Sequence, residues 1–272
     1  MNVALYGLGR MGAHHQRHLV AAGHAVAVFD PARGLRGDER GVEAVVVATP
    51  TRTHLEVALP WLERGVPVLV EKPLASSVSE AEILAAFPHC AVGHVERFNP
   101  AFEAIRQVSP GFVQAERLAP WADRGTDVDV VLDLMIHDLD LFAALTRSPV
   151  REVRANGLAV RSGLVDIVHA RVETGAGQVG VFTASRISRK AQRSLRVFAA
   201  AGYYSADLKN HTVTHVDGAL TETAIPIASG DALAAELRAF FGALGGGERF
   251  CVSAADALSV LRVAEVIRCA CS

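Results

Sequence analysis

The sequence is poor in lysine, which occurs three times against twenty-four arginines in 272 residues. Cysteine is scarce too, and the four cysteines lack the spacing of metal ligands, so no metal site is expected. No apolar run is long enough to span a bilayer. The formal net charge is −2, without a basic or acidic tract. These absences argue against a membrane partner and a nucleic-acid partner.

The lysine shortage makes each remaining lysine informative, because an ammonium group can lower its pKa and exchange a proton whereas guanidinium stays charged. Lys72 is of most interest because it follows a predicted buried strand. Half of the residues are hydrophobic, which is ample for a packed core. No basic or long apolar segment precedes the first predicted strand, so we expect a cytoplasmic protein with reduced thiols.

The first hundred residues alternate short apolar runs with helical patterns, which is typical of a doubly wound parallel α/β sheet. The predicted strands are 3–6, 25–29, 44–48, 66–70 and 91–95, and the predicted helices are 10–22, 54–64 and 79–87. Ser79 and Glu82 form a candidate capping box at the start of the third helix.

A different pattern follows Phe98-Asn99-Pro100. A short helix (101–108) and a strand (112–118) precede a helix around residue 135, and strands 152–160, 165–173, 178–185, 196–200 and 204–208 come next. Helices at 232–244 and 254–271 end the sequence. Strands in series predict an α+β domain with a mostly antiparallel open sheet. The predicted domains are therefore 1–97 and 98–272.

Glycines at 7, 9 and 12, around Leu8, Arg10 and Met11, lie between the first strand and the first helix. This context is typical of a dinucleotide fingerprint, in which glycines let a pyrophosphate approach the helix N-terminus. Asp30 ends the next strand, where an acid can bind the ribose hydroxyls, and this favours NAD. Arg33 and Arg36 keep NADP as the alternative. A glycine-rich turn without a ligand is the competing interpretation.

Two further motifs follow predicted strands and so lie near a ligand crevice. Thr49-Pro50 leads to His54, although the same residues can simply start a helix. Glu71-Lys72-Pro73 places opposite charges at a strand end, which an ion pair alone could explain.

Asp133 and His137 are four residues apart in an apolar helix and therefore share a face. An aspartate one turn from a histidine can fix its tautomer and stabilise its charged form, as proton transfer requires.

These motifs, in this order, resemble the glucose–fructose oxidoreductase, inositol dehydrogenase and rhizopine catabolism (Gfo/Idh/MocA) family. The resemblance rests on Gly7–Gly12, Thr49-Pro50, Glu71-Lys72-Pro73, Arg97-Phe-Asn99-Pro and the Asp133–Asp140 run, and continues to Ala235–Phe240. It implies a Rossmann domain, a second domain whose open sheet supports a homo-oligomer (dimer or tetramer), and NAD(P)-dependent oxidation of a sugar or cyclitol hydroxyl.

The resemblance also implies roles for individual residues. Lys72 would orient and polarise the reacting hydroxyl, His137 would remove its proton, and Asp133 would orient His137 or bind the substrate. Glu71 would contact the nicotinamide ribose. Residues of the glycine turn, together with Asp30, Thr49, Pro50, His54 and Lys72, would bind the cofactor, and Arg97 and Asn99 would bind substrate.

The run from Asp127 to Asp138, with Thr183–Arg186 downstream, is similar to a narrower branch, the bacterial UDP-N-acetylglucosamine 3-dehydrogenases. In that branch Arg186 would meet the diphosphate of a nucleotide sugar. A basic, solvated strand end explains Arg186 equally well.

One departure from the family concerns residues 31–42, which are too few for the helices and strand expected there. Part of the adenine side of the cofactor site is therefore expected to be missing. Two other functions remain open at this stage, a glycoside hydrolase with tightly held NAD and a non-catalytic NAD-binding sensor.

Overall fold

The computed structural model describes residues 1–122, 128–245 and 249–271. Contacts between Cα atoms divide the chain into two compact units, Met1–Val95 with Ala232–Leu258, and Glu96–Asp231 with Ser259–Ser272. The predicted domain boundary after residue 97 remains a prediction. The structure adds that segment 232–258 associates with the N-terminal unit.

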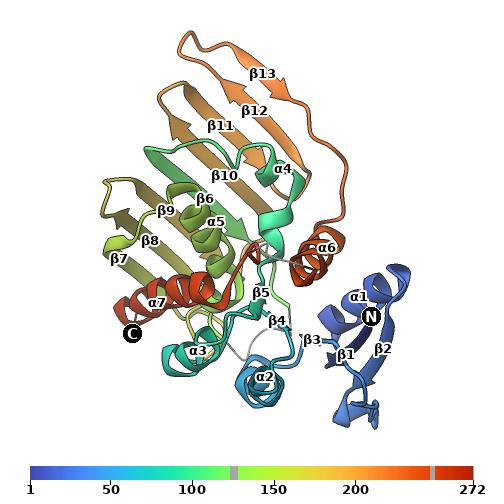
Figure 1. Cartoon of the computed structure of the whole chain (residues 1–272). Helices are drawn as coiled ribbons and strands as arrows, with labels where there is room; N and C mark the ends of the chain where they lie inside the picture. The colour runs from blue at the N-terminus through green and yellow to red at the C-terminus, as the bar shows by residue number, and fades with distance from the viewer. Residues whose placement is uncertain (123–127, 246–248, 272) are drawn as a thin grey trace. The chain divides into compact units, whose positions relative to one another are not determined.

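The N-terminal unit contains a parallel sheet with the strand order β2-β1-β3-β4-β5 among the described residues (Figure 1). The strands are β1 (Asn2–Tyr6), β2 (Ala25–Phe29), β3 (Ala44–Val47), β4 (Val68–Glu71) and β5 (Cys90–Gly93). The helices between them are α1 (Arg10–Ala21), α2 (His54–Glu63) and α3 (Val78–Ala85), and α6 (Ala232–Leu244) belongs to the same unit. The predicted shortened Rossmann sheet is confirmed.

β2 is the edge strand because residues 31–43 contribute no strand to this sheet. They form instead a 3₁₀ turn, η1 (Pro31–Arg33), and a bridge between Asp30 and Leu35. Phe29 stacks on Tyr6 with 4.5 Å between ring centroids. A Cβ at Gly37 would lie 2.8 Å from the Phe29 ring, so the short connection packs tightly against β2.

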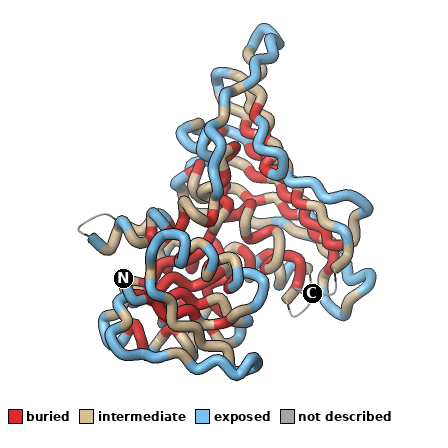
Figure 2. The backbone as a smooth tube through the Cα atoms, turned by 90° about the vertical axis from the view of Figure 1, so that its right-hand side faces the viewer, coloured by how far each residue is buried: buried red, intermediate tan, exposed pale blue. Residues whose placement is uncertain are grey.

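The core of this unit lies between the sheet and the helices α1 and α6. β3, β4 and β5 are buried along their whole length. Buried backbone is drawn red in Figure 2. Leu19 of α1 and Phe240 of α6 join Val3, Leu5 and Val46 in one apolar cluster. Strands buried on both faces explain why these segments appear in the sequence as continuous apolar runs.

The second unit contains a larger sheet with the order β13-β12-β11-β10-β6-β9-β8-β7 in the described chain (Figure 1). The strands are β6 (Phe112–Leu118), β7 (Val150–Leu158), β8 (Ile167–Thr174), β9 (Val179–Ser185), β10 (Gln192–Ala199), β11 (Gly202–Asp207), β12 (Thr212–Val216) and β13 (Glu222–Ile225). β6 and β9 pair parallel, and the other neighbouring strands pair antiparallel.

Helices α4 (Pro100–Glu103) and α5 (Ile136–Thr146) contact this sheet, α4 through β11 and α5 through β6 and β9. A π-helical turn, η4 (Val131–Met135), leads directly into α5 and contacts β9. Helix α7 (Ala254–Ala270) is the last helix of the described chain. The predicted α+β class is confirmed for this unit.

Three sequence predictions about single elements were wrong. Helix α3 is capped by Ser77, whose Oγ accepts the Glu80 amide at 3.3 Å, and not by Ser79. The helix predicted for 101–108 is the shorter α4, and β12 and β13 were not predicted. Most of the residues in these two strands are half-buried or exposed, so they lack the apolar alternation by which strands are found.

Within the residues that the structure describes, no helix is long and apolar enough to cross a membrane.

Candidate functional site

The glycine turn has the backbone that a dinucleotide requires. Gly7 has φ +86°, and a Cβ there would lie 2.6 Å from the Ala48 carbonyl oxygen. A Cβ at Gly12 would lie 1.9 Å from the Gly7 carbonyl oxygen, so helix and turn touch without room for a side chain. Around Gly9, by contrast, no described atom lies within 4 Å of an added Cβ. The turn is therefore tightly packed at Gly7 and Gly12, and it leaves space beside Gly9.

The N-terminus of α1 is suited to bind an anion. Gly9 is the N-cap and offers no side chain to the first amides, and the first turn contains no acidic residue. The partial positive charge of the helix end is therefore available to a phosphate group. Arg10 and Met11, both exposed, are the first two residues of the helix.

Asp30 holds the glycine turn from the end of β2. Its Oδ2 accepts the Leu8 amide at 2.7 Å, and its Oδ1 accepts the Arg33 amide at 3.2 Å. The carboxylate therefore has a fixed orientation beside the turn, as expected for an acid that binds ribose hydroxyls.

The loop after β3 is joined to the Lys72 segment through His54. The ring of His54 is buried, with Nε2 3.0 Å from the Thr49 carbonyl and Nδ1 3.0 Å from the Pro73 carbonyl. Burial lowers the pKa of His54, although both carbonyl contacts favour the charged ring. Pro50 begins the turn between β3 and α2. His54 therefore links the loop after β3 to the segment after β4, both of which are predicted to bind the cofactor.

Glu71 ends β4 beside two other buried titratable side chains. His15 Nε2 lies 2.7 Å from Glu71 Oε1, and ligand-type atoms of His15, Glu71 and Glu236 lie within 4.8 Å of one another. Burial opposes ionisation of Glu71, but the hydrogen bond and charge of His15, with the charge of Lys72, hold its pKa below the usual value. The contact with His15 has the length of a charge-assisted hydrogen bond.

Lys72 follows Glu71 and precedes Pro73 across a cis peptide bond. Its amide donates to Glu71 Oε2 at 3.2 Å. The carboxylate of Glu71 therefore fixes the backbone of Lys72 on one side and contacts α1 through His15 on the other.

In the second unit, Asp133 lies in the π-helical turn η4 and His137 in the first turn of α5. Residues 129–142 are all described, and every one of them is buried except Asp133, Leu134 and His137. Single π-helical turns occur frequently at functional sites. The two predicted catalytic residues of this unit are therefore the polar groups that this stretch leaves accessible.

An ion-pair network underlies α5. Arg117 donates to Asp138 and to Glu96, at 2.7 Å and 2.9 Å, and all three side chains are buried. Arg97 pairs with buried Asp140 through two hydrogen bonds of 2.6 Å and 2.8 Å. Asp138 and Asp140 are both buried, whereas His137 between them in sequence is half-buried.

Asn99, predicted to bind substrate, has its whole amide engaged within the protein. Its Nδ2 donates to Glu96 Oε2 at 3.0 Å and to the Leu208 carbonyl at 2.8 Å, and its Oδ1 accepts the Ala101 amide at 3.0 Å. Asn99 is the N-cap of α4. Its substrate role, like that of Arg97, remains a prediction.

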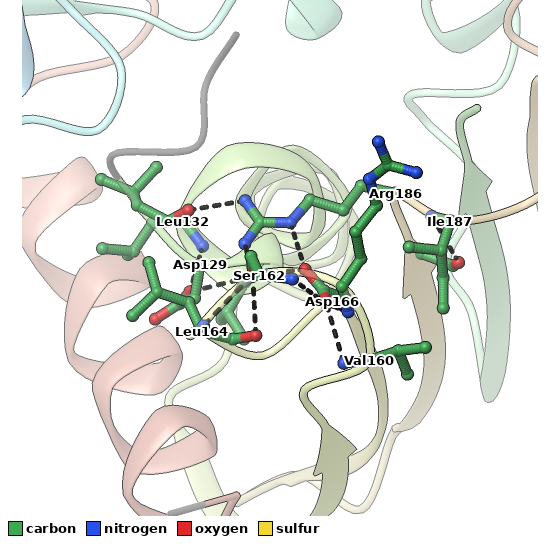
Figure 3. A network of polar contacts seen from close by, with 12 residues as sticks. Asp129, Leu132, Val160, Ser162, Leu164, Asp166, Arg186 and Ile187 are labelled. Atoms are coloured by element: carbon green, nitrogen blue, oxygen red, sulfur yellow. Dashed lines mark hydrogen bonds and ion pairs between the residues drawn. The ribbon is translucent and has the colours of Figure 1, made fainter. Parts of the chain in front are cut away.

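Arg186 is held in a similar way by the contacts drawn in Figure 3, and it is buried rather than solvated. Its Nε donates to Asp166 Oδ1 at 2.9 Å, and Nη1 donates to the Val128 carbonyl at 2.7 Å. Asp166 Oδ2 also accepts three successive amides, from Val160 to Ser162. These bonds lower the pKa of Asp166. The contact of Arg186 with a diphosphate remains a prediction, and Asp127 of the same motif lies outside the described residues.

Sequence reasoning missed His15, Asp129 and Asp166. Each is buried and makes contacts across long stretches of sequence, or with backbone amides. A helix cap at Asp129 is the one signal that the sequence offered, since an aspartate directly before an apolar helical run is a preferred N-cap.

Comparisons with known proteins agree with this geometry. Residues 20–88 match the oxidoreductase family model with an NAD-binding Rossmann fold (Gfo/Idh/MocA), and residues 102–205 match the Gfo/Idh/MocA C-terminal domain. UDP-N-acetylglucosamine 3-dehydrogenase from Acidithiobacillus ferrooxidans is 34% identical over 90% of this chain and 88% of its own. Scyllo-inositol 2-dehydrogenase (NAD(+)) from Bacillus subtilis is 27% identical over 68% of this chain and 67% of its own.

A solved structure of the Acidithiobacillus ferrooxidans enzyme superposes with a TM-score of 0.92 at 33% identity, covering 100% of this chain and 97% of that chain. Sequence, fold and glycine turn lead to the same assignment. The chain belongs to the Gfo/Idh/MocA family of oxidoreductases, and its N-terminal unit contains the family's NAD-binding Rossmann fold.

Proposed function

We propose that this oxidoreductase oxidises a hydroxyl of a nucleotide sugar, with UDP-N-acetylglucosamine as the substrate and its 3-hydroxyl as the reacting group. The observation that supports this most is that Asp133 and His137 are half-buried polar residues in the stretch 129–142, where the other residues except Leu134 are buried. A relative that matches 90% of this chain at 34% identity carries that activity in its name.

The residues of the glycine turn fit NAD. The turn is open where a Cβ at Gly9 would point, α1 offers uncapped amides, and Asp30 is oriented beside the turn. Bound NAD supplies the hydride acceptor at its nicotinamide. Gly7, Gly9, Gly12 and Asp30 hold the dinucleotide in this proposal, with Arg10, Met11, Thr49, Pro50 and His54 around it.

The proton chemistry falls to Lys72, Asp133 and His137. Neutral His137 accepts the proton of the sugar hydroxyl while the hydrogen on the same carbon leaves with its electron pair as hydride, so the alcohol becomes a ketone. The carboxylate of Asp133 stabilises the imidazolium. The ammonium of Lys72 orients the hydroxyl and stabilises negative charge that develops on its oxygen. Arg97, Asn99 and Arg186 stay in the proposal as substrate contacts, in addition to the hydrogen bonds that each forms within the protein.

The test is a set of sugars offered to the purified protein with NAD and with NADP, with NADH or NADPH formation followed by absorbance. The proposal expects NADH with UDP-N-acetylglucosamine and little with inositols. Glycoside cleavage without NADH would identify the hydrolase instead, and NAD binding without turnover would identify a sensor. The protein is also proposed to be cytoplasmic and to form a homo-dimer or homo-tetramer, which light scattering on the purified chain will decide.

A further inference from the structure

The π-helical turn that contains Asp133 is bound at its N-terminal end by a buried aspartate, Asp129. Its Oδ1 accepts the amides of Val131 at 3.0 Å and Leu132 at 3.1 Å, and its own carbonyl accepts the Asp133 amide at 3.0 Å. One residue thus binds three of the first amides of the turn. Capping of this kind satisfies donors that the start of a helix leaves without a partner.

The second oxygen of Asp129 is bound from the far end of the chain. Oδ2 accepts a hydrogen bond from Nε of Arg268 on α7, 139 positions later in the sequence. The Asp129 side chain is 8% exposed and that of Arg268 is 31% exposed, so the pair is largely screened from water. The other side of the guanidinium donates to Glu265 Oε2 at 2.6 Å.

The residues on either side of Asp129 are fixed as well. The Val128 carbonyl accepts Arg186 Nη1 at 2.7 Å, and the Val130 amide donates to the Val165 carbonyl at 3.1 Å. Figure 3 shows Asp129 beside the Arg186–Asp166 pair. The approach to the π-helical turn is therefore bound to α7 and to the β8–β9 region at three successive residues.

There is a physical reason for so many hydrogen bonds next to the π-helical turn. A π-helical turn is a rare conformation of the backbone and persists where surrounding contacts impose it. Asp133 belongs to this turn and His137 to the first turn of α5, which follows it directly. A shift of the π-helical turn therefore moves both side chains. In an oriented active site a displacement of ~1 Å costs about 10²-fold in rate.

We propose that Asp129 and Arg268 are positioning residues, which hold Asp133 and His137 in register for the reaction by tying the π-helical turn to α7. The inference rests on the proposed function. It adds two residues that touch neither the cofactor nor the reacting hydroxyl in that scheme.

The experiment compares five variants. R268Q removes the ion pair and leaves the Asp129 cap in place, D129N keeps an amide oxygen for the cap but loses the charge, and D129A removes both. E265Q is the matched control because it alters Glu265, another partner of Arg268. A fifth variant, R268K, keeps the charge and tests rescue.

Steady-state rates with UDP-N-acetylglucosamine and NAD give the main measurement. We expect kcat to fall about tenfold in R268Q and about 10²-fold in D129A, with KM within about threefold, since orientation and not binding is lost. D129N should resemble R268Q, R268K should recover part of the rate, and E265Q should match the wild type. An R268Q rate equal to that of the wild type overturns the inference, even if D129A fails to fold.

A second measurement separates this inference from the proposed function. In ¹H–¹³C spectra of the histidine rings, R268Q should shift the His137 signals and leave those of His215 in place. If the wild type reduces no NAD, the proposed function is wrong. The change in the His137 ring signals still tests whether Asp129 and Arg268 position His137. Unchanged His137 signals in R268Q overturn the positioning role by themselves.

Discussion

His15 Nε2 lies 2.7 Å from Glu71 Oε1, and this contact joins the helix after the glycine turn to the strand that ends at Glu71, directly before Lys72. Both residues are buried, at 0% and 8% exposure. A hydrogen bond to a buried carboxylate is worth more than one at the surface, and its loss leaves a charge without its partner. The pair therefore couples the proposed cofactor turn to the proposed catalytic lysine.

Replacement of His15 by leucine should therefore affect stability and turnover together. We expect H15L to lose about 1–3 kcal/mol of the free energy of unfolding, because the Glu71 carboxylate loses a buried donor. The rate should fall as well, since the Lys72 amide is held by the same carboxylate. Urea unfolding and NADH formation measure the two effects. H14L, a half-buried histidine one position earlier, is the control and should change neither.

The glycine turn allows a paired test of cofactor binding. G9A should fold like the wild type, because no described atom lies within 4 Å of the new Cβ, yet bind NAD at least about tenfold more weakly where the pyrophosphate approaches. G12A should destabilise the fold itself, since its Cβ would lie 1.9 Å from the Gly7 carbonyl oxygen. Calorimetry with NAD and thermal unfolding distinguish the two. Equal NAD affinity in G9A and wild type would contradict the proposed binding mode.

Asp30 should set the preference for NAD. In D30A the ribose hydroxyls lose an acceptor and the Leu8 amide loses its partner at 2.7 Å. We expect NAD affinity to fall about tenfold, which corresponds to one lost hydrogen bond to a charged group. NADP affinity should hold or rise, because a negative charge near the 2′-phosphate is removed. D38N, an exposed aspartate in the same connection, is the control. A D30A protein that still prefers NAD to the same degree would rule out this role.

Asp166 should make stability depend on pH in the acid range. Its pKa is lowered in the folded protein by hydrogen bonds from the Ser162 hydroxyl and from the amides of residues 160–162. A lowered folded pKa means that its stabilisation is complete above the unfolded value of about 3.9 and is lost as pH falls below it.

We therefore expect D166N to lose about 3 kcal/mol of the free energy of unfolding at pH 7, since Arg186 keeps a buried charge without its carboxylate. The difference from the wild type should shrink below about pH 4. Urea unfolding across pH 3 to 7 measures it, with E152Q as a surface control. A difference that stays constant with pH would contradict the assigned cause.

The sequence allowed the parallel sheet to be predicted almost residue by residue. Buried apolar runs such as Val68–Glu71 carry strong strand signals, and the glycine turn marks the first crossover. The shortened connection after Asp30 could be predicted from its length. The spacing of Asp133 and His137 predicted a shared helical face; the π-helical turn that contains Asp133 was not predicted.

The contacts that the sequence did not predict join residues that are far apart in the chain. Asp129 and Arg268 are 139 residues apart, and His15 and Glu71 are 56 apart. Nothing local in the sequence links such partners. The same limit applies to Arg97, Asn99 and Arg186, whose polar groups looked available for substrate. In the structure they are engaged with Asp140, Leu208 and Asp166.

The central claim is that His137 accepts the proton of a sugar hydroxyl while NAD accepts the hydride. The most direct test is NADH formation from UDP-N-acetylglucosamine by the wild type, H137N and K72M, with NAD affinity measured alongside. Loss of general-base catalysis should lower kcat of H137N by about 10²–10⁴-fold, and its NAD affinity should stay within about threefold of the wild type. An H137N variant that keeps the wild-type rate would contradict the account.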